Sequence, residues 1–334
     1  MEPARPSSSA GLWLLLLGGA AAALAFLAWP AHGPGPAPRD SAADGAAAFD
    51  AAAAFEDLRA IVALGPRTHG SPGLAACQAL IERRLREAGT GVRVDAFEYT
   101  GVSGRPARFK NLFGHFGPEG APPVWIGTHP DTQARCHNDP DPAKRDRPVP
   151  GANDGGSGVA VLLELARCFR RAPPPVPVVL ACFDGEDYGG PGELGRDYLV
   201  GSRRAAETLP DDPAARPRAV VIVDLVAERA AEFPRRSDFQ AGAPGLADAV
   251  WGAAARAGAA AFFSDRLAYA LSDDHSAFLA RGVPALVVID YEYGPGNAWW
   301  HSTADTLDKC DAVTLGAVGR TLLEWVRAGA PLTK

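Results

Sequence analysis

The sequence has 334 residues, with 33 lysines and arginines against 39 aspartates and glutamates, so its formal net charge is −6 at pH 7. This acidic balance argues against a nucleic-acid-binding surface, which would be basic. The five cysteines form no CxxC pair, which excludes a disulfide-dense scaffold and a cysteine-based zinc finger. The length fits one large α/β domain or two small ones.

An uncharged apolar run covers residues 11–29, and a Pro-, Ala- and Gly-rich stretch follows it. Such a run is typical of a targeting segment, either a signal peptide or a single membrane anchor. Trp29 and Pro30 stand where a small-residue cleavage site would lie, which favours an uncleaved anchor over a cleaved signal. We therefore expect a signal or anchor segment over 1–31, a linker over 32–46, one domain over 47–334, and a location outside the cytoplasm.

Helical periodicity marks the start of this domain and alternates later with short apolar runs. Helices are predicted at 47–63, 73–89, 156–170, 244–258, 273–281 and 311–328. Strands are predicted at 92–99, 107–116, 123–128, 176–183, 219–224 and 285–290. This alternation indicates a single α/β domain with a mixed, mostly parallel central sheet flanked by helices. The segments near 132–149 and 186–200 are expected to be loops of the same domain.

Side chains of metal-binding type stand at the ends of the predicted strands or just before a predicted helix. They are His129, Asp154, Glu186, Asp187, Asp224 and His301. Ligand sites in open α/β sheets lie beyond the carboxyl ends of the strands, so these side chains are expected to meet at one sheet edge. Imidazole nitrogen together with carboxylate oxygen is a ligand set suited to zinc, with an open position for substrate.

Each of these residues alone also has an ordinary structural explanation. His129 could be a satisfied core histidine, and His301, beside two tryptophans, could serve packing. Asp154 and Asp224 could cap a helix or a turn, and the Glu186–Asp187 pair could be a solvated loop edge. The occurrence of all of them at strand ends or helix starts is what favours a metal site.

The motifs, taken in order, resemble the M28 zinc aminopeptidase superfamily, and within it most closely the animal-type glutaminyl-peptide cyclotransferases and their bacterial relatives. The resemblance covers about residues 50–328. It is carried by HxD at 129–131, GANDGGSGVAVLLELAR at 151–167, FDGEDYG at 183–189, VDL at 223–225, DDH at 273–275 and WHSTADTLDK at 300–309. GPR…GSP at 65–72 and YLVGSR at 198–203 also resemble that branch.

The resemblance implies a zinc-dependent catalytic domain that converts the N-terminal glutamine of peptides or proteins to pyroglutamate and releases ammonia. Asp154, Asp187 and His301 would be the zinc ligands, and Glu186 the general base and acid. His129, with Asp224, matches a second metal position of the aminopeptidases. The cyclotransferases keep similar positions yet bind one zinc ion. The resemblance therefore implies one zinc ion, and the sequence does not exclude a second.

Further roles follow from the same resemblance. Asp131 would orient His129, and Asp273 and Asp224 would belong to the catalytic hydrogen-bond network. Trp300 would form a wall of the substrate pocket. Asp273 also suits a helix N-cap and Trp300 ordinary core packing, so these alternatives stay open.

The sequence departs from the cyclotransferase pattern around the substrate pocket. Glycines and a proline at 189–192 stand where the animal enzymes carry a tryptophan, and the loop at 291–299 is unlike theirs. A zinc aminopeptidase of the M28 type, in which Glu186 deprotonates a water molecule, is therefore the alternative function. A non-catalytic binding module is a third hypothesis, which the complete ligand set argues against. Peptide N-termini are the expected partners, with the membrane as a partner of the N-terminal segment and no nucleic acid.

Overall fold

The computed structural model describes residues 48–89, 91–190 and 197–333. The signal or anchor segment expected at 1–31 and the linker expected at 32–46 lie outside the described residues. A search of the described residues finds no helix with the length and apolar character that a membrane span requires.

A six-stranded sheet forms the centre of the fold, with the strand order β1-β2-β4-β3-β5-β8. Its strands are β1 (Val92–Thr100), β2 (Pro106–Phe116), β3 (Val124–Thr128), β4 (Val178–Cys182), β5 (Ala219–Asp224) and β8 (Ala285–Ile289). The pairs β1/β2 and β2/β4 are antiparallel, whereas β4/β3, β3/β5 and β5/β8 are parallel. Every residue of β3, β4, β5 and β8 is buried, as expected for short apolar strands covered on both faces.

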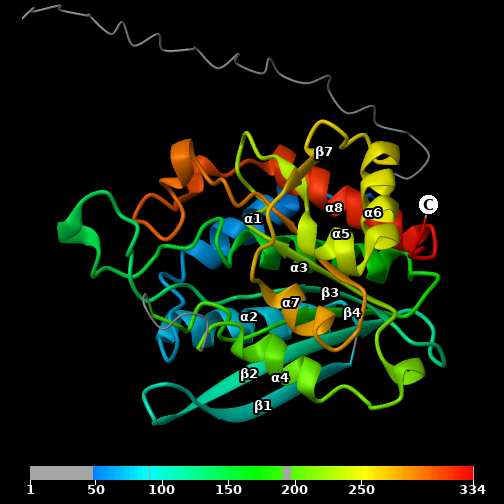
Figure 1. Cartoon of the computed structure of the whole chain (residues 1–334), viewed down its shortest axis with the longest axis horizontal. Coiled ribbons are helices and arrows are strands. Elements are labelled where there is room, and N and C mark those ends of the chain that lie inside the picture. The colour runs from blue at the N-terminus through cyan, green and yellow to red at the C-terminus, as the bar shows by residue number, and fades with distance from the viewer. Residues whose placement is uncertain (1–47, 90, 191–196, 334) are drawn as a thin grey trace, which may run out of the picture. The chain divides into compact units, whose positions relative to one another are not determined.

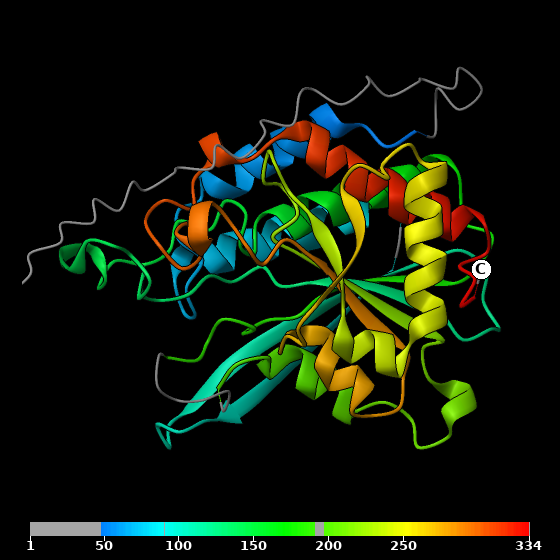
Figure 2. The same ribbon diagram turned by 45° about the horizontal axis from the view of Figure 1, so that its top comes forward.

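Helices cover both faces of this sheet (Figures 1 and 2). On one face lie α1 (Ala51–Val62), α2 (Pro72–Glu87), α3 (Ser157–Arg171), α6 (Pro244–Arg256) and α8 (Ala312–Arg327). On the other face lie α4 (Val200–Glu207) and α7 (Asp274–Leu279). The two faces bury separate apolar cores because alternate strand residues point to opposite sides: Ile126 packs into the first core and its neighbour Trp125 into the second.

The N-terminal helices begin where the sequence provides capping side chains. The Asp50 carboxylate accepts a hydrogen bond from the backbone N–H of Ala53 at 3.0 Å, which caps α1. The Ser71 hydroxyl accepts from the N–H of Leu74 at 3.1 Å, and Pro72 occupies the first position of α2. Both arrangements satisfy N–H groups that a helix start leaves without a partner.

The predicted fold class is confirmed, since the chain forms a single α/β domain with a mixed, mostly parallel sheet between helices. Sequence analysis did not predict α4, the short helix α5 (Ser237–Gly242), or the two-stranded parallel sheet of β6 (Phe233–Arg236) and β7 (Phe263–Ala268). Strand β6 was not predicted because half of its residues are arginines, so it lacks the apolar pattern of a buried strand. Arg235 is nevertheless buried, since its guanidinium pairs with Asp248 at 3.0 Å and Asp265 at 2.8 Å.

The carboxyl ends of β3, β4, β5 and β8 lie at the same edge of the sheet, because these four strands are parallel. The segments that follow them carry the residues singled out by the sequence motifs. His129 follows β3, Glu186 and Asp187 follow β4, and Asp224 ends β5. The fold therefore brings together side chains that are up to 172 residues apart in the chain, His129 and His301 being the most distant.

Candidate active site

Three side chains converge at the centre of this edge. Asp154, Asp187 and His301 each offer one ligand atom, and these atoms lie within 4.8 Å of one another. His301 Nε2 is 3.3 Å from Asp154 Oδ2 and 3.1 Å from Asp187 Oδ1. All three side chains are buried, and Oδ2 of Asp154 and Oδ2 of Asp187 have no hydrogen-bond partner. Two buried carboxylates with unsatisfied oxygens beside one imidazole fit a zinc ion, which takes such oxygen and nitrogen ligands.

A second group of ligand type adjoins the first and shares Asp154 with it. His129, Asp154 and Asp224 also offer ligand atoms within 4.8 Å of one another. His129 Nε2 is 3.4 Å from Asp154 Oδ1 and forms a hydrogen bond of 3.1 Å with Asp224 Oδ1. The two oxygens of Asp154 thus face the two groups separately. This is the arrangement that a pair of neighbouring cations would require, although the His129–Asp224 hydrogen bond also satisfies that pair without a cation.

Glu186 lies beside both groups and lines a cavity of about 280 Å³. Burial, together with the neighbouring Asp187 carboxylate, raises the pKa of Glu186 well above its usual value. A carboxyl group with a raised pKa exchanges a proton more readily near neutral pH than an ordinary glutamate does. Asp273 lines the same cavity, and burial, together with the Asp224 carboxylate, raises its pKa to about 6.

Aromatic side chains form much of the remaining wall. Tyr198, Tyr291 and Trp300 line the cavity, and no lysine or arginine of the described residues lines it. The Trp300 ring stacks on His301, with ring centroids 4.0 Å apart and an interplanar angle of 22°. Tyr291 packs against Trp300 in turn, at a centroid distance of 5.1 Å. Trp300 therefore lies where sequence analysis expected a pocket wall, and it also fixes one face of His301.

Asp273 both caps a helix and lies at the cavity, the two alternatives that the sequence left open. Its carboxylate accepts a hydrogen bond from the N–H of Asp274 at 2.5 Å, and the Ser276 hydroxyl accepts from the N–H of Asp273 at 3.4 Å. This is a capping box, and it starts α7. The same carboxylate is buried and lines the cavity. The cap thus holds the acidic group at the site.

Asp131 differs from the expectation that it orients His129. Its Oδ1 lies 3.7 Å from His129 Nδ1, which is longer than a hydrogen bond, and this imidazole nitrogen has no partner. The two Asp131 oxygens instead accept from the backbone N–H groups of Gly185 at 3.1 Å and Asp187 at 3.0 Å. Asp131 therefore fixes the turn that carries Glu186 and Asp187.

Sequence analysis noted the GPR motif at 65–67 but gave Arg67 no role. The side chain is fully buried and donates to the backbone carbonyls of Pro130 at 2.8 Å, Gly151 at 2.6 Å and Asp154 at 3.2 Å. It ties the segment after β3 to the segment that carries Asp154. The sequence could not have shown this role, because the carbonyl groups that accept from Arg67 belong to residues far from it in the chain.

Asp305 supports the same ligand from the opposite side. Its carboxylate accepts from the N–H of Asn153 at 2.8 Å, the N–H of Asp154 at 3.2 Å and the Tyr293 hydroxyl at 2.9 Å. Burial, together with the Asp154 carboxylate, raises the pKa of Asp305 to about 7. Arg67 and Asp305 together form hydrogen bonds with the backbone carbonyl and N–H of Asp154, which fixes the backbone of this residue.

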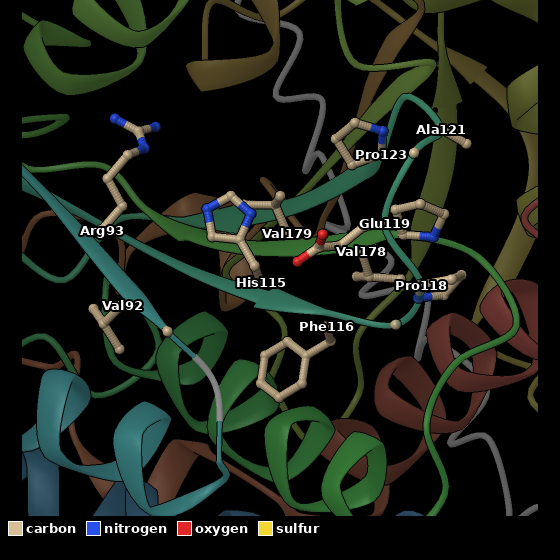
Figure 3. Close-up of a pocket in the computed structure, with 14 residues that line it drawn as sticks. Val92, Arg93, His115, Phe116, Pro118, Glu119, Ala121, Pro123, Val178 and Val179 are labelled. Carbon is tan, nitrogen blue, oxygen red and sulfur yellow. The ribbon is translucent and has the colours of Figure 1, made fainter.

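A larger cavity, of about 610 Å³, lies at the opposite edge of the sheet (Figure 3). Arg93, His115 and Glu119 are the titratable side chains on its wall, which is otherwise formed by apolar residues and glycines. Within the described ranges, groups of three metal-binding side chains occur only around Asp154 and His129. The smaller cavity is therefore the candidate active site.

The mixed sheet and the buried acidic and histidine ligands beyond its parallel strands define an α/β metalloenzyme of the zinc-exopeptidase fold. A Zn-dependent exopeptidase from Parabacteroides distasonis has this fold, with a TM-score of 0.78 and 29% identity over 84% of this chain and 98% of that one. Residues 111–326 match the family model described as Peptidase family M28. The chain belongs to this family.

Glutaminyl cyclases are among the similar proteins. The glutaminyl-peptide cyclotransferase of Bos taurus is 27% identical over 303 residues, which cover 81% of this chain and 80% of that protein. The crystal structure of Tannerella forsythia glutaminyl cyclase has a TM-score of 0.78 and 30% identity, covering 84% of this chain and 99% of that one. The resemblance to the M28 superfamily and its glutaminyl cyclases is confirmed.

Proposed function

We propose that this protein is a zinc-dependent glutaminyl-peptide cyclotransferase, which converts N-terminal glutamine of peptides or proteins to pyroglutamate and releases ammonia. The observation that carries the proposal is the cavity itself. It has about 280 Å³ of space, aromatic walls, and Glu186 beside the Asp154–Asp187–His301 group. This space suits a single amino-acid side chain, and several of the relatives that match along most of the chain are glutaminyl cyclases.

Zinc is the cofactor, and Asp154, Asp187 and His301 would hold it. When bound there, zinc would polarise the γ-carboxamide carbonyl of the substrate glutamine. We assign one zinc ion to this group. The unsatisfied oxygens of Asp154 and Asp187 support the assignment.

Glu186 would move the proton that the reaction must transfer. The substrate's free α-amine attacks the carbonyl carbon of the γ-carboxamide, so a nitrogen–carbon bond forms there and the bond from the same carbon to the carboxamide nitrogen breaks. The amine loses one proton to a Glu186 oxygen, and Glu186 passes it to the departing nitrogen, which leaves as ammonia. The raised pKa of Glu186 suits both halves of this transfer.

The other cavity residues would bind and orient the substrate. Asp273 and Asp224 carry acceptor oxygens that can steer the amine toward the carbonyl carbon of the γ-carboxamide. Trp300, with Tyr291 and Tyr198, would pack on the aliphatic part of the glutamine side chain and exclude water. Among the described residues, the titratable side chains of this wall are carboxylates, a tyrosine pair and His301, with no lysine or arginine.

A comparison of products tests this function. Purified protein is incubated with a Gln-initiated peptide, with the same peptide carrying an acetylated N-terminus, and with a Leu-initiated peptide. We expect ammonia from the first alone, because acetylation removes the nucleophilic amine. Thorough chelation is expected to abolish ammonia release, and added zinc to restore it. Free leucine without ammonia, or full activity after chelation, would refute the proposal.

An M28 aminopeptidase is the second candidate, and the His129–Asp154–Asp224 group is the observation that favours it. In that reaction Glu186 would take a proton from a water molecule that attacks the first peptide bond. Zinc content separates the candidates, because two tightly bound ions per chain favour the peptidase. The Leu-initiated peptide of the product comparison provides the functional discrimination.

We also propose that the domain at 47–334 acts outside the cytoplasm. The support is the uncharged apolar run at 11–29, which suits a membrane anchor or a secretory signal. Fractionation of cells that express the full chain tests this proposal. An anchor predicts activity in the membrane fraction that detergent releases, whereas activity confined to the cytoplasm would contradict it.

A further inference from the structure

His301 adopts a backbone conformation that histidine rarely takes. Its φ of 50° lies in the left-handed region, where a side chain crowds the backbone. Such a conformation has an energetic cost and persists only where the surrounding structure holds the residue in place. The contacts around His301 therefore indicate what fixes this ligand.

The two ring nitrogens of His301 face different partners. Nε2 points to the carboxylates of Asp154 and Asp187, at 3.3 and 3.1 Å. Nδ1 faces Nε2 of His137 at 3.3 Å, and the two imidazole rings are 77° apart in orientation. Trp300 stacks on the face of the same ring. The position of the His301 ring is thus fixed by the stacking and by the contact at Nδ1.

The residues next to His137 hold the backbone around His301. We call residues 136–139 the clamp segment. The N–H of Asn138 donates to the carbonyl of His301 at 3.2 Å. Oδ2 of the buried Asp139 accepts from the N–H of Thr303 at 2.9 Å and from its hydroxyl at 2.5 Å. Both views show the green excursion that contains the clamp segment beside the orange segment before His301 (Figures 1 and 2).

The clamp segment is itself held within its own excursion. The N–H of Cys136 donates to the carbonyl of Arg147 at 2.7 Å, and the N–H of Asp139 donates to the carbonyl of Cys136 at 2.9 Å. The Arg145 guanidinium donates to the carbonyl of Asp139 at 2.8 Å. Segment 132–149, which connects β3 to α3, is therefore held by its own hydrogen bonds. Its clamp segment contacts the loop that carries His301.

We propose that His137 is the positioning residue for the metal ligand His301. A histidine that ligates a metal through one nitrogen carries its proton on the other, and a hydrogen-bond acceptor there fixes the ring. For His301, ligation through Nε2 places that proton on Nδ1, and Nε2 of His137 is the acceptor. The inference rests on the zinc site of the proposed function, and it adds a residue that contacts His301 but is not part of the cavity lining.

Zinc affinity tests the role of His137 independently of turnover. The metal-free full chain is titrated with zinc alone, in competition with a chromophoric chelator. His137→Ala removes the acceptor and is expected to weaken zinc binding by about 10- to 100-fold. His137→Gln places an amide oxygen at a position similar to Nε2, and it should restore the affinity to within about threefold of wild type. His115→Ala, at the opposite edge of the sheet, is the control and should leave the affinity unchanged.

The outcomes separate this inference from the proposed function. Unchanged zinc affinity in His137→Ala overturns the positioning role. Equal losses in His137→Ala and His137→Gln also overturn it, because the acceptor would then not be what matters. A wild-type protein that binds zinc but yields no ammonia from Gln-initiated peptides refutes the proposed function alone, since the affinity comparison among the variants still applies.

Discussion

Glu186 and Asp187 are neighbours in the chain, yet the structure gives their carboxylates different surroundings. Asp187 is buried, its N–H is held by Asp131, and Oδ1 lies 3.1 Å from His301 Nε2. Glu186 faces the cavity, and its raised pKa prepares it for proton transfer. Adjacent residues at the end of a strand can thus take different positions at one site, because a turn directs their side chains differently. This difference supports the proposed division into a ligand, Asp187, and a base, Glu186.

Replacing Glu186 by glutamine tests this division. The amide keeps the size of the side chain but cannot accept a proton, so kcat for ammonia release should fall by about two orders of magnitude or more. Zinc content, measured by elemental analysis, should stay at the wild-type level. Glu119→Gln, at the exposed wall of the opposite cavity, is the matched control. Near-full activity in Glu186→Gln would remove Glu186 from the mechanism.

At the scale of elements, the start of α3 determines where the Asp154 segment lies. Gly158 lies in the first turn of α3, directly against β3 and β5. A Cβ atom at Gly158 would lie 2.0 Å from Thr128 Oγ1 and 2.5 Å from the carbonyl oxygen of Val223. The helix can approach the sheet this closely because residue 158 has no side chain. Sequence analysis predicted the helix but not this contact.

Gly158→Ala is therefore expected to destabilise the protein. Overpacking against the rigid Val223 carbonyl should cost about 1–3 kcal/mol, more than alanine gains through its helix propensity. Gly252→Ala in α6 is the matched control, because its Cβ would meet only the flexible Arg256 side chain at 3.6 Å. That variant should be stabilised by about 0.5–1 kcal/mol. Urea denaturation measures both, and equal effects would contradict the proposed close contact.

At the scale of the whole molecule, buried carboxyl groups link stability to pH. Asp290 and Glu228 are both buried outside the catalytic cavity. Burial, together with the Glu228 carboxylate, raises the pKa of Asp290 to about 8. The folded protein therefore keeps a proton on Asp290 between about pH 4 and pH 8, whereas the unfolded chain releases it. Stability from this group falls as the pH rises through that range.

Asp290→Asn should remove this pH dependence, because the amide has no proton to lose. The variant is expected to gain stability over wild type as the pH rises from 5 to 8, by on the order of 3–4 kcal/mol, since each pH unit in this range corresponds to about 1.4 kcal/mol. Thermal unfolding of both proteins at several pH values measures the difference. A difference that stays constant over this range would contradict the assignment.

Several features of the fold could be predicted from the sequence because they depend on local patterns. The apolar strands β3, β5 and β8 and the amphipathic helix α3 follow from hydrophobic periodicity. Strand β6 could not be predicted from the sequence, because two of its four residues are arginines, and the carboxylates that pair with Arg235 lie on α6 and β7. The clustering of Asp154, Asp187 and His301 was expected from their positions at strand ends and from the family resemblance, while their roles as ligands stay a prediction.

The amino-acid sequence by itself determined the fold class, the family, and the set of acidic and histidine residues from which a site could be built. These follow from periodicity and from short motifs, which are properties of neighbouring residues. Only the tertiary structure decided that Asp131 supports a turn rather than His129, that Arg67 joins two loops, and that His137 meets His301. Such contacts join residues that lie far apart in the chain, so no local pattern encodes them.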